Sequence, residues 1–275
     1  FIQTNFIDYK NSDIYCGNSK EDFLGESCFE WRQGVKHDCS KVVELTKNKN
    51  VLLNGNCEEV NIEDFLVYTL VKSSMFKQPI ITNSIKKVII TQTRVGEDTS
   101  KIQKFAPCTW SYLQNNIKYF NKRKSVIYKN SPQFAIFGIG DYSFAPYKVG
   151  ISGFYKEPLF SLIYNSENDK PIMTDDTVYF ISFNNYETAY TAMLCLNTDK
   201  VLDFLKSISF QDSKRPYTKQ ILKKIDFYKI VNKICLLDLI QVEKKFNIPQ
   251  YINEIMYENF KKYVYELSQN NKKTH

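Results

Sequence analysis

Apolar residues follow two different spacings in this sequence, and the change from one to the other limits the folds that the chain can adopt. Short β-branched and apolar runs bounded by Gly, Pro and Asn-Asp turns are typical of strands, and they occur at 85–92, 133–139, 147–151, 158–164 and 177–183. Their short connections predict a mixed, mostly antiparallel sheet.

Helical spacing appears between and after these runs. After Pro107, apolar residues recur three and four positions apart up to Phe120, which predicts a helix with a basic last turn at 121–124. Later helices are expected at 186–196, 198–209, about 218–246 and after Pro249. The first 60 residues are polar and broken by glycines, which favours loops and short strands. The pattern predicts an α+β fold with helices flanking the sheet and a helical C-terminal subdomain.

The composition is that of a globular protein, because 43% of the residues are apolar and 24% are charged. No stretch reaches the ~18 consecutive apolar residues that a membrane span requires. The N-terminal residues have neither an initiator Met nor the layout of a signal peptide. Seven cysteines without a C-x-x-C pair, and only two histidines, argue against a zinc site and favour reduced thiols. We therefore expect a soluble, cytoplasmic chain taken from a longer protein.

Lys and Arg outnumber Asp and Glu by 37 to 30, which gives a formal charge of +7. Such an excess attracts phosphate if the cations gather on one surface. The frequent use of Lys, Asn, Ile and Tyr has an equally good explanation in an AT-rich genome. Charge alone therefore leaves nucleic-acid binding open.

The segment 131–134, Ser-Pro-Gln-Phe, comes close to a catalytic loop. Amino-methylating DNA methyltransferases hold the target amine with an Asp/Asn/Ser-Pro-Pro-aromatic loop, whose ring stacks on the flipped base. Here Gln133 stands where the second Pro belongs, and no glycine-bearing cofactor motif precedes it. We therefore interpret the segment as a turn that leads into a strand.

Other acidic groups also lack the pattern of an active site. Asp238, Glu243 and Lys245 imitate the arrangement of a metal-dependent nuclease, but a charge-rich predicted helix favours a solvated face. The acid pairs at 97–98 and 175–176 are more typical of turns and caps than of a metal site. Because His37 is the only internal histidine, no Ser-His-Asp or Cys-His set can be assembled. The sequence therefore predicts no catalytic or metal-binding residues.

Basic and aromatic residues interleave instead in five polar segments: 31–41, 93–100, 122–125, 140–148 and 212–216. Each segment alone is typical of solvated surface, but all five together favour one DNA-facing cleft. The candidate DNA-binding residues in these segments are Arg32, Gln33, Lys36, Lys41, Arg94, Arg123, Lys124, Ser125, Tyr142, Lys148, Lys214 and Arg215.

Seven motifs follow one another in order: WRQGVKHDCSK (31–41), GEDTS (96–100), RKS (123–125), FGIGDYSF (137–144), YKVGISG (147–153), KPIMTDDT (170–177) and KRP (214–216). Together they resemble the C-terminal target-recognition region of bacterial adenine-specific DNA methyltransferases. These enzymes occur in restriction-modification systems and include single chains that also carry a nuclease. Because the resemblance covers residues 28 to 226, we expect a target-recognition, DNA-binding domain at 1–226 and a helical extension at 227–275.

The resemblance implies a division of labour within a longer enzyme. In such enzymes an N-terminal domain binds S-adenosylmethionine and methylates a flipped adenine, while the C-terminal region grips double-stranded DNA and reads bases from the major groove. It implies that this fragment holds no cofactor and that its partners are double-stranded DNA and the missing N-terminal catalytic domain of the same protein.

Within this division we expect a specific role for each group of candidate residues. Arg94, Arg123, Lys214 and Arg215 are expected to contact phosphate or guanine, Lys36, Lys41 and Lys148 to steer the duplex, and Tyr142 and Gln33 to read bases.

Two other interpretations stay open. One is a stand-alone, metal-dependent nuclease that uses Asp238, Glu243 and Lys245 and cuts DNA with Mg²⁺. The other is a protein-interaction module whose surface, drawn from 19 Tyr and 20 Phe in the chain, docks a catalytic subunit.

Overall fold

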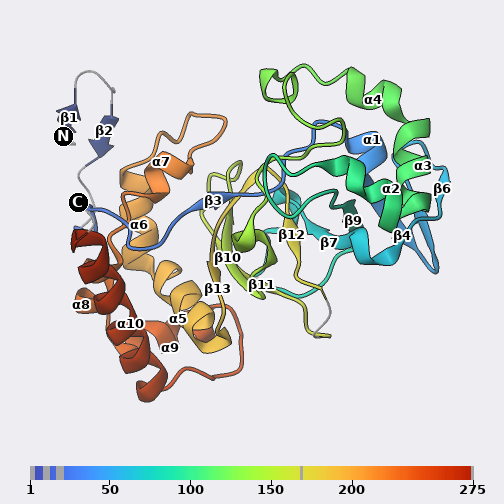
Figure 1. The fold of residues 1–275 in the computed structure, drawn as a ribbon. Coiled ribbons are helices and arrows are strands. Elements are labelled where there is room, and N and C mark those ends of the chain that lie inside the picture. The colour runs from blue at the N-terminus through green and yellow to red at the C-terminus, as the bar shows by residue number, and fades with distance from the viewer. Residues whose placement is uncertain (1–3, 9–12, 17–21, 168–169, 274–275) are drawn as a thin grey trace.

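A computed structural model of the chain describes residues 4–8, 13–16, 22–167 and 170–273 (Figure 1). The strands are β1 (Thr4–Asp8), β2 (Asp13–Cys16), β3 (Arg32–Gln33), β4 (Glu44–Asn48), β5 (Val51–Leu53), β6 (Glu59–Val60), β7 (Val67–Val71), β8 (Ile80–Ile81), β9 (Lys86–Ile89), β10 (Tyr147–Ser152), β11 (Phe160–Tyr164), β12 (Met173–Thr174) and β13 (Val178–Phe183). The α-helices are α1 (Ser40–Val43), α2 (Ile102–Phe105), α3 (Pro107–Asn115), α4 (Ile117–Asn121), α5 (Tyr186–Leu196), α6 (Asp199–Ser207), α7 (Lys219–Leu222), α8 (Phe227–Lys233), α9 (Leu236–Lys245) and α10 (Glu254–Lys273).

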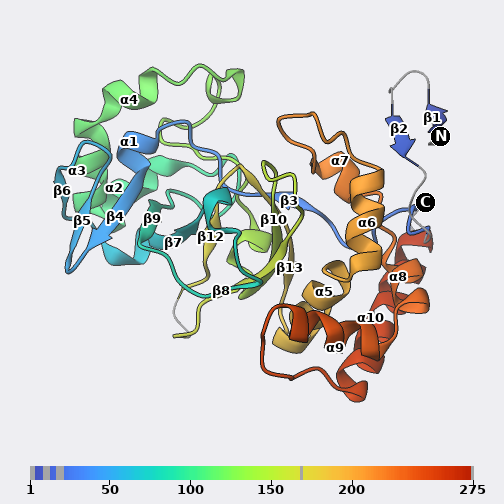
Figure 2. The same ribbon diagram turned by 180° about the vertical axis from the view of Figure 1, so that it is seen from behind.

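A central sheet separates the two sides of the molecule, with helices α5 to α10 on one side and strands β4, β5, β7 and β9 with helices α1 to α4 on the other (Figures 1 and 2). Its strand order is β3-β13-β10-β11-β8. β10 is antiparallel to both of its neighbours, so Val149 lies opposite Leu162 and Ile181. Only β8 runs parallel to its partner in this sheet. The mostly antiparallel pairing matches the short connections in the sequence.

The second sheet has the order β12-β7-β9-β4-β5-β6. Its strands share one core with α3 and α4, in which Leu45 and Val88 of the sheet are buried together with Leu113 and Phe120 of the helices. The apolar spacing predicted after Pro107 therefore buries one face of these helices. The predicted single helix is divided at Asn116, whose side-chain amide donates to a backbone carbonyl of α3 at 2.9 Å.

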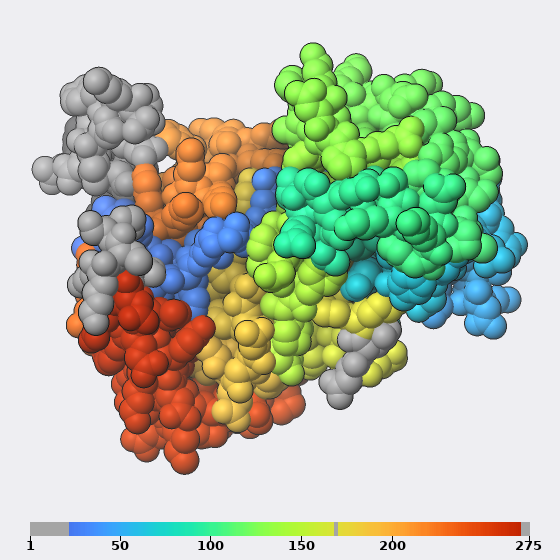
Figure 3. Space-filling view, viewed as in Figure 1, coloured from blue at the N-terminus to red at the C-terminus, as the bar shows by residue number. Residues whose placement is uncertain are grey.

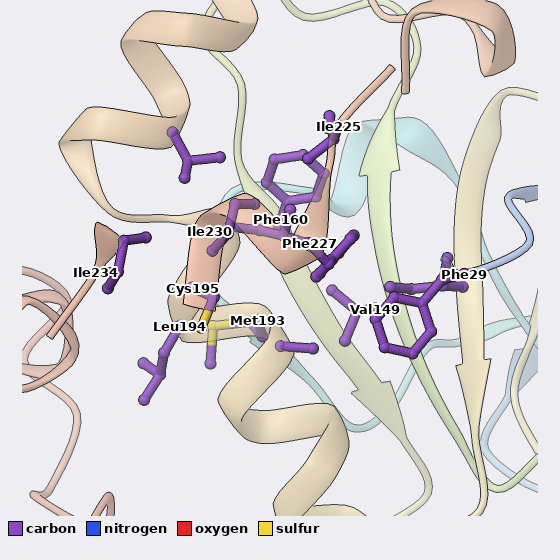
Figure 4. Packing of buried hydrophobic residues seen from close by; sticks show 14 of the residues in the cluster. Phe29, Val149, Phe160, Met193, Leu194, Cys195, Ile225, Phe227, Ile230 and Ile234 are labelled. Carbon is purple, nitrogen blue, oxygen red and sulfur yellow. The ribbon is translucent and has the colours of Figure 1, made fainter. Parts of the chain in front are cut away.

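The C-terminal helices share a core with the central sheet. Figure 4 shows Val149 and Phe160 of the sheet in one cluster with Cys195 of α5 and Ile230 of α8, and the same core continues into α10. Burial of one such apolar side chain contributes ~1.5–3 kcal/mol relative to its exposure. Packing is continuous across residue 226, so the division of the chain into two domains at that residue stays a prediction.

The architecture confirms the predicted α+β class, since a mostly antiparallel sheet is flanked by helices and followed by a helical C-terminal part. The predicted strands are confirmed at β9, β10, β11 and β13, as are the helices α5 and α6. Among the described helices, none combines the length and the apolar composition that crossing a membrane requires.

The strand predicted at 133–139 is wrong. This segment is a turn followed by irregular backbone, with a single bridge to Lys36. Gly138 has a φ of +66°, a left-handed conformation that ends the extended run. A carbonyl and an amide of the segment bond to the side chains of Thr91 and Gln92, at 2.8 and 3.2 Å. These side chains therefore provide hydrogen bonds that the backbone of a neighbouring strand would provide in a sheet.

Candidate nucleic-acid interface

The edge strand β3 brings together segments that are far apart in the sequence. It pairs antiparallel with β13, and the residues after it form isolated bridges to Asp175 and Phe137. On the face seen in Figure 3, the blue segment that contains β3 runs between the orange and red helical part and the green part of the molecule. We use the name junction surface for residues 30–38, for the segments that contact them, 122–137, 140–144 and 175–177, and for the loop 212–216, which reaches the same region through Phe154.

Two glycines permit the close crossing of these segments. A Cβ atom on Gly138 would lie 2.2 Å from the carbonyl oxygen of Gly34, and a Cβ atom on Gly34 would lie 2.2 Å from the carbonyl oxygen of Asp175. Any other residue at these positions would push β3 away from its neighbours.

Arg32 and Tyr142 form one contact of the junction surface. The guanidinium carbon of Arg32 lies 4.4 Å from the centroid of the Tyr142 ring, and Arg32 also pairs with Glu30. Burial raises the pKa of the Tyr142 hydroxyl, while the charge of Arg32 opposes this rise. The structure therefore brings two predicted residues from separate segments together as a stacked cation and a protonated hydroxyl.

Gln33 and Lys36 both contact the turn at 175–177. The side-chain amide of Gln33 donates to the carbonyl oxygen of Asp176 at 2.5 Å. The Lys36 ammonium lies 2.6 Å from a carboxylate oxygen of Asp38 and 3.9 Å from one of Asp176. Both predicted residues therefore lie in the junction surface and already have protein partners there.

A pocket of about 430 Å³ lies beside this turn, and its lining includes His37, Glu44, Lys72, Phe154 and Asp175. The Lys72 ammonium is 2.8 Å from a carboxylate oxygen of Glu44 and 3.7 Å from one of Asp175. Burial disfavours the charge of Glu44, but hydrogen bonds from His37 and Lys72 hold its pKa at about 2. These charges compensate one another, and no three ligand side chains in the described ranges are grouped to hold a metal ion.

Arg123 is held within its own loop. Its guanidinium donates to the carbonyl oxygens of Ala135 at 2.7 Å, Gln133 at 2.8 Å and Phe120 at 3.2 Å. The guanidinium carbon is also 3.9 Å from the centroid of the Tyr128 ring. Burial lowers the pKa of this guanidinium, although an arginine at this site keeps its charge at neutral pH. This geometry makes Arg123 a clamp of the loop, and its contact with phosphate or guanine stays a prediction.

The neighbouring lysines of this loop remain available. Lys124 is exposed, and Ser125 directly precedes the 3-10 turn η4 (Val126–Tyr128). Lys122 and Lys129 are exposed on the same loop, although the sequence interpretation did not select them. A signal for them existed, because residues 99–140 hold seven Lys and Arg but no Asp or Glu.

Lys214 and Arg215 approach the junction surface from the helical side. Lys214 is exposed, and the guanidinium carbon of Arg215 lies 4.7 Å from the centroid of the Phe154 ring. Phe154 lines the pocket beside the turn at 175–177. The loop 212–216 is thereby connected to the segment that follows β3.

Three predicted residues lie apart from the junction surface. Lys148 is 1% exposed, and its ammonium donates to the carbonyl oxygen of Ala145 at 2.8 Å. Burial lowers its pKa to about 7. A side chain enclosed in this way cannot steer a phosphate, so that expectation is corrected. Arg94 and Lys41 are exposed, and within the described residues no interaction links either side chain to the junction surface.

The near match to a catalytic loop is a turn, as the sequence predicted, but no strand follows it directly. The amide of Ala135 donates to the carbonyl oxygen of Pro132 at 2.9 Å. Phe134 is fully buried, with its ring centroid 5.3 Å from that of Trp110 and 4.9 Å from that of Phe120. A ring packed in this way cannot stack on a flipped base.

The three nuclease candidates do not converge on one site. Asp238 caps the first turn of its own helix, and Lys245 pairs with Asp199 at 2.6 Å. Glu243 is 1% exposed rather than solvated, and one carboxylate oxygen accepts from the Tyr190 hydroxyl at 2.7 Å and from two backbone amides at 2.9 and 2.8 Å. Each charge serves local structure.

Comparison with known proteins shows that the chain is similar to part of a Type II methyltransferase. It is 42% identical over 204 residues to the Type II methyltransferase M.NspV of Nostoc sp. (strain ATCC 29411 / PCC 7524), a match that covers 74% of this chain and 42% of that protein. The resemblance to DNA methyltransferases that the ordered motifs predicted is therefore confirmed. The chain spans less than half the length of this relative.

The comparisons with family profiles and with solved structures are less informative. No known family profile matches the sequence. Among solved structures, the Type IIL restriction-modification enzyme MmeI in complex with DNA aligns with a TM-score of 0.46 and 9% identity, covering 92% of this chain and 38% of that chain.

Proposed function

We propose that this chain is the module that recognises specific double-stranded DNA for a longer, adenine-specific methyltransferase of a restriction-modification system. The observation that carries the proposal is the meeting of four predicted basic and aromatic segments at the junction surface. Residues 31–38, 122–125, 142 and 214–215 come from four separate parts of the chain. A duplex needs such a surface, since phosphate contacts set its position and side chains in a groove read its bases.

The groups of the junction surface suit these two tasks. Lys122, Lys124 and Lys214 are exposed and, in the described part of the chain, have no carboxylate partner, so phosphates can replace only water and counterions around them. Arg32 and Tyr142 present a fork of N–H donors and a hydroxyl, which are the kinds of groups that read base edges.

Methyl transfer itself is assigned to the remainder of the longer enzyme. The described residues offer no ring that could stack on a flipped adenine at the 131–134 turn, because Phe134 is buried. S-adenosylmethionine would be bound by the catalytic domain, and this chain would hold the duplex from which the adenine is flipped.

The test measures the affinity of the chain for a DNA duplex by fluorescence anisotropy, at salt concentrations from about 50 to 200 mM. We expect the logarithm of the affinity to fall linearly with the logarithm of salt concentration. The double variant Lys214→Ala/Arg215→Ala should bind more weakly, whereas Lys244→Ala/Lys262→Ala, which removes the same charge from α9 and α10, should not. An affinity independent of salt, or equal losses in both variants, would refute the proposal.

Sequence specificity needs its own experiment. Repeated selection of bound duplexes from a randomised pool should enrich one short site, and the Arg32→Ala variant should enrich it less strongly. A pool that stays random after selection would reduce the proposal to non-specific DNA binding.

A further inference from the structure

The tip of the loop 122–131 exposes two adjacent apolar side chains. Val126 is 71% exposed and Ile127 is 41% exposed, whereas Tyr128 in the same 3-10 turn is 9% exposed. The turn therefore points one residue into the protein and two out of it. Two neighbouring apolar residues on a polar loop are costly in water, at roughly 25 cal/mol for each Å² left exposed.

The loop is too firmly held for this exposure to be a failure of packing. Arg123 bonds three carbonyl groups across its base. The Tyr128 hydroxyl donates to the carbonyl oxygen of Lys36 at 3.3 Å, and its ring centroid is 5.4 Å from that of Phe137. Near the tip, the Ser131 hydroxyl donates to the carbonyl oxygen of Ile127 at 2.7 Å. The apolar pair is thus presented on an organised support that is joined to the junction surface.

Three lysines lie within four residues of this tip along the chain. Lys122, Lys124 and Lys129 are exposed, and none of the described carboxylates pairs with them. A protein partner of this tip would need an acidic rim around an apolar pocket. A DNA duplex offers the same combination at any base step that partly unstacks, because the apolar faces of the two bases are then accessible and phosphates flank them.

We propose that Val126 and Ile127 form a wedge that enters the duplex and partly unstacks one base step, while Lys122, Lys124 and Lys129 hold the flanking phosphates. The inference rests on the proposed function and deepens it. Unstacking costs a few kcal/mol for each base step, and it bends the duplex so that more protein surface can contact it. Base steps that unstack easily would then be preferred at positions where no side chain reads the bases.

The test uses the whole chain with a duplex labelled at both ends for energy transfer, and the double variant Val126→Ser/Ile127→Ser. The unaltered chain should increase energy transfer as the duplex bends. The variant should bind about tenfold more weakly and leave the duplex straight, since it has lost the apolar contact. Its salt dependence should be unchanged, because every lysine is retained.

Ile255→Ser supplies the matched control, since Ile255 is 74% exposed on α10 and lies outside the loop. This variant should bind and bend DNA like the unaltered chain, and all variants should keep the same melting temperature. Binding without bending by the unaltered chain, or equal bending by the wedge variant, would overturn the wedge and leave the proposed function intact. No duplex binding by the unaltered chain would overturn the proposed function itself.

Discussion

Residues 99–140 and the C-terminal helices at 227–270 both carry many lysines, but they use them differently. The first segment has seven Lys and Arg with no acid, and the second has six Lys with five Asp and Glu. On the helices, Lys229 pairs with Asp22 at 2.9 Å and Lys261 with Glu258 at 2.7 Å. Among the seven cations of residues 99–140, Arg123 is the one whose side chain is fixed by hydrogen bonds. Its acceptors are carbonyl oxygens.

The difference separates cations that serve the fold from cations that remain free for a partner. Exposed ion pairs contribute only ~0–1 kcal/mol each, so the helices gain little stability from them, but the acids reduce the net charge of residues 227–270 to +1. A surface whose cations have no acidic neighbours keeps a positive electrostatic potential, which attracts a polyanion. For the attraction of a polyanion, the net charge of the chain therefore matters less than the position of the segment that has no acidic residues.

The triple variant Lys122→Ala/Lys124→Ala/Lys129→Ala should have the largest effect on duplex affinity. Loss of three phosphate contacts should weaken duplex binding about a hundredfold at low salt and reduce the slope of log affinity against log salt by about 2–3. Anisotropy titrations measure both quantities. Lys244→Ala/Lys261→Ala/Lys262→Ala removes equal charge from α9 and α10, and a comparable loss in that control would erase the distinction between the two regions.

Glu243→Ala tests the helical side. Removal of this carboxylate leaves the Tyr190 hydroxyl and two backbone amides without their acceptor. We expect the free energy of unfolding to fall by about 2–3 kcal/mol in urea titrations. Duplex affinity of the folded variant should stay unchanged. Should the unaltered chain instead cut DNA with Mg²⁺ and this variant not, the nuclease interpretation would gain the support that the structure withholds.

Arg123→Lys distinguishes a clamp from a phosphate contact. A lysine keeps the charge but cannot reach three carbonyl groups at once, so the free energy of unfolding should fall by about 1–2 kcal/mol. Chemical denaturation of the two proteins provides the measurement. Unchanged stability would favour the phosphate contact that the sequence suggested.

Lys148→Met should have the smallest effect on duplex binding, because it changes only the pH dependence of stability. Burial lowers the pKa of Lys148 to about 7, against about 10.4 for a lysine in an unfolded chain. Between these values the unfolded chain binds more protons, so this lysine makes the free energy of unfolding rise with pH. Below pH 7 both states are protonated and the folded chain carries the full cost of the buried charge.

Melting temperatures from pH 6 to 9 test this effect. The methionine variant should be more stable at pH 6, and its advantage over the unaltered chain should shrink as the pH rises. A constant difference between the two proteins would show that the ammonium is not destabilised by its surroundings.

Local patterns predicted much of the fold. The strands β10, β11 and β13 and the helices α5 and α6 follow from the spacing of apolar residues within each element. Residues 133–139 have the composition of a strand, but most of their long-range partners are side chains, those of Thr91, Gln92 and Arg123. Such long-range partners leave no periodic signal in the sequence.

The candidate site was only partly predictable, for the same reason. Arg123 and Lys148 were selected because they are basic and lie among polar or aromatic residues. Their surroundings come from other segments, since carbonyl groups enclose Arg123 and β10 is covered as a central strand. The absence of acids from 99–140 is a property of the sequence itself, and it identifies Lys122 and Lys129 without any structure.

Footprinting of the chain by hydroxyl radicals, with and without a bound duplex, tests most directly whether distant loops serve one DNA-binding surface. The account predicts joint protection of the β3 segment, the 122–131 loop and the 212–216 loop, with α9 and α10 as reactive as in the free chain. Protection confined to α9 and α10, or to one of these loops alone, would contradict it.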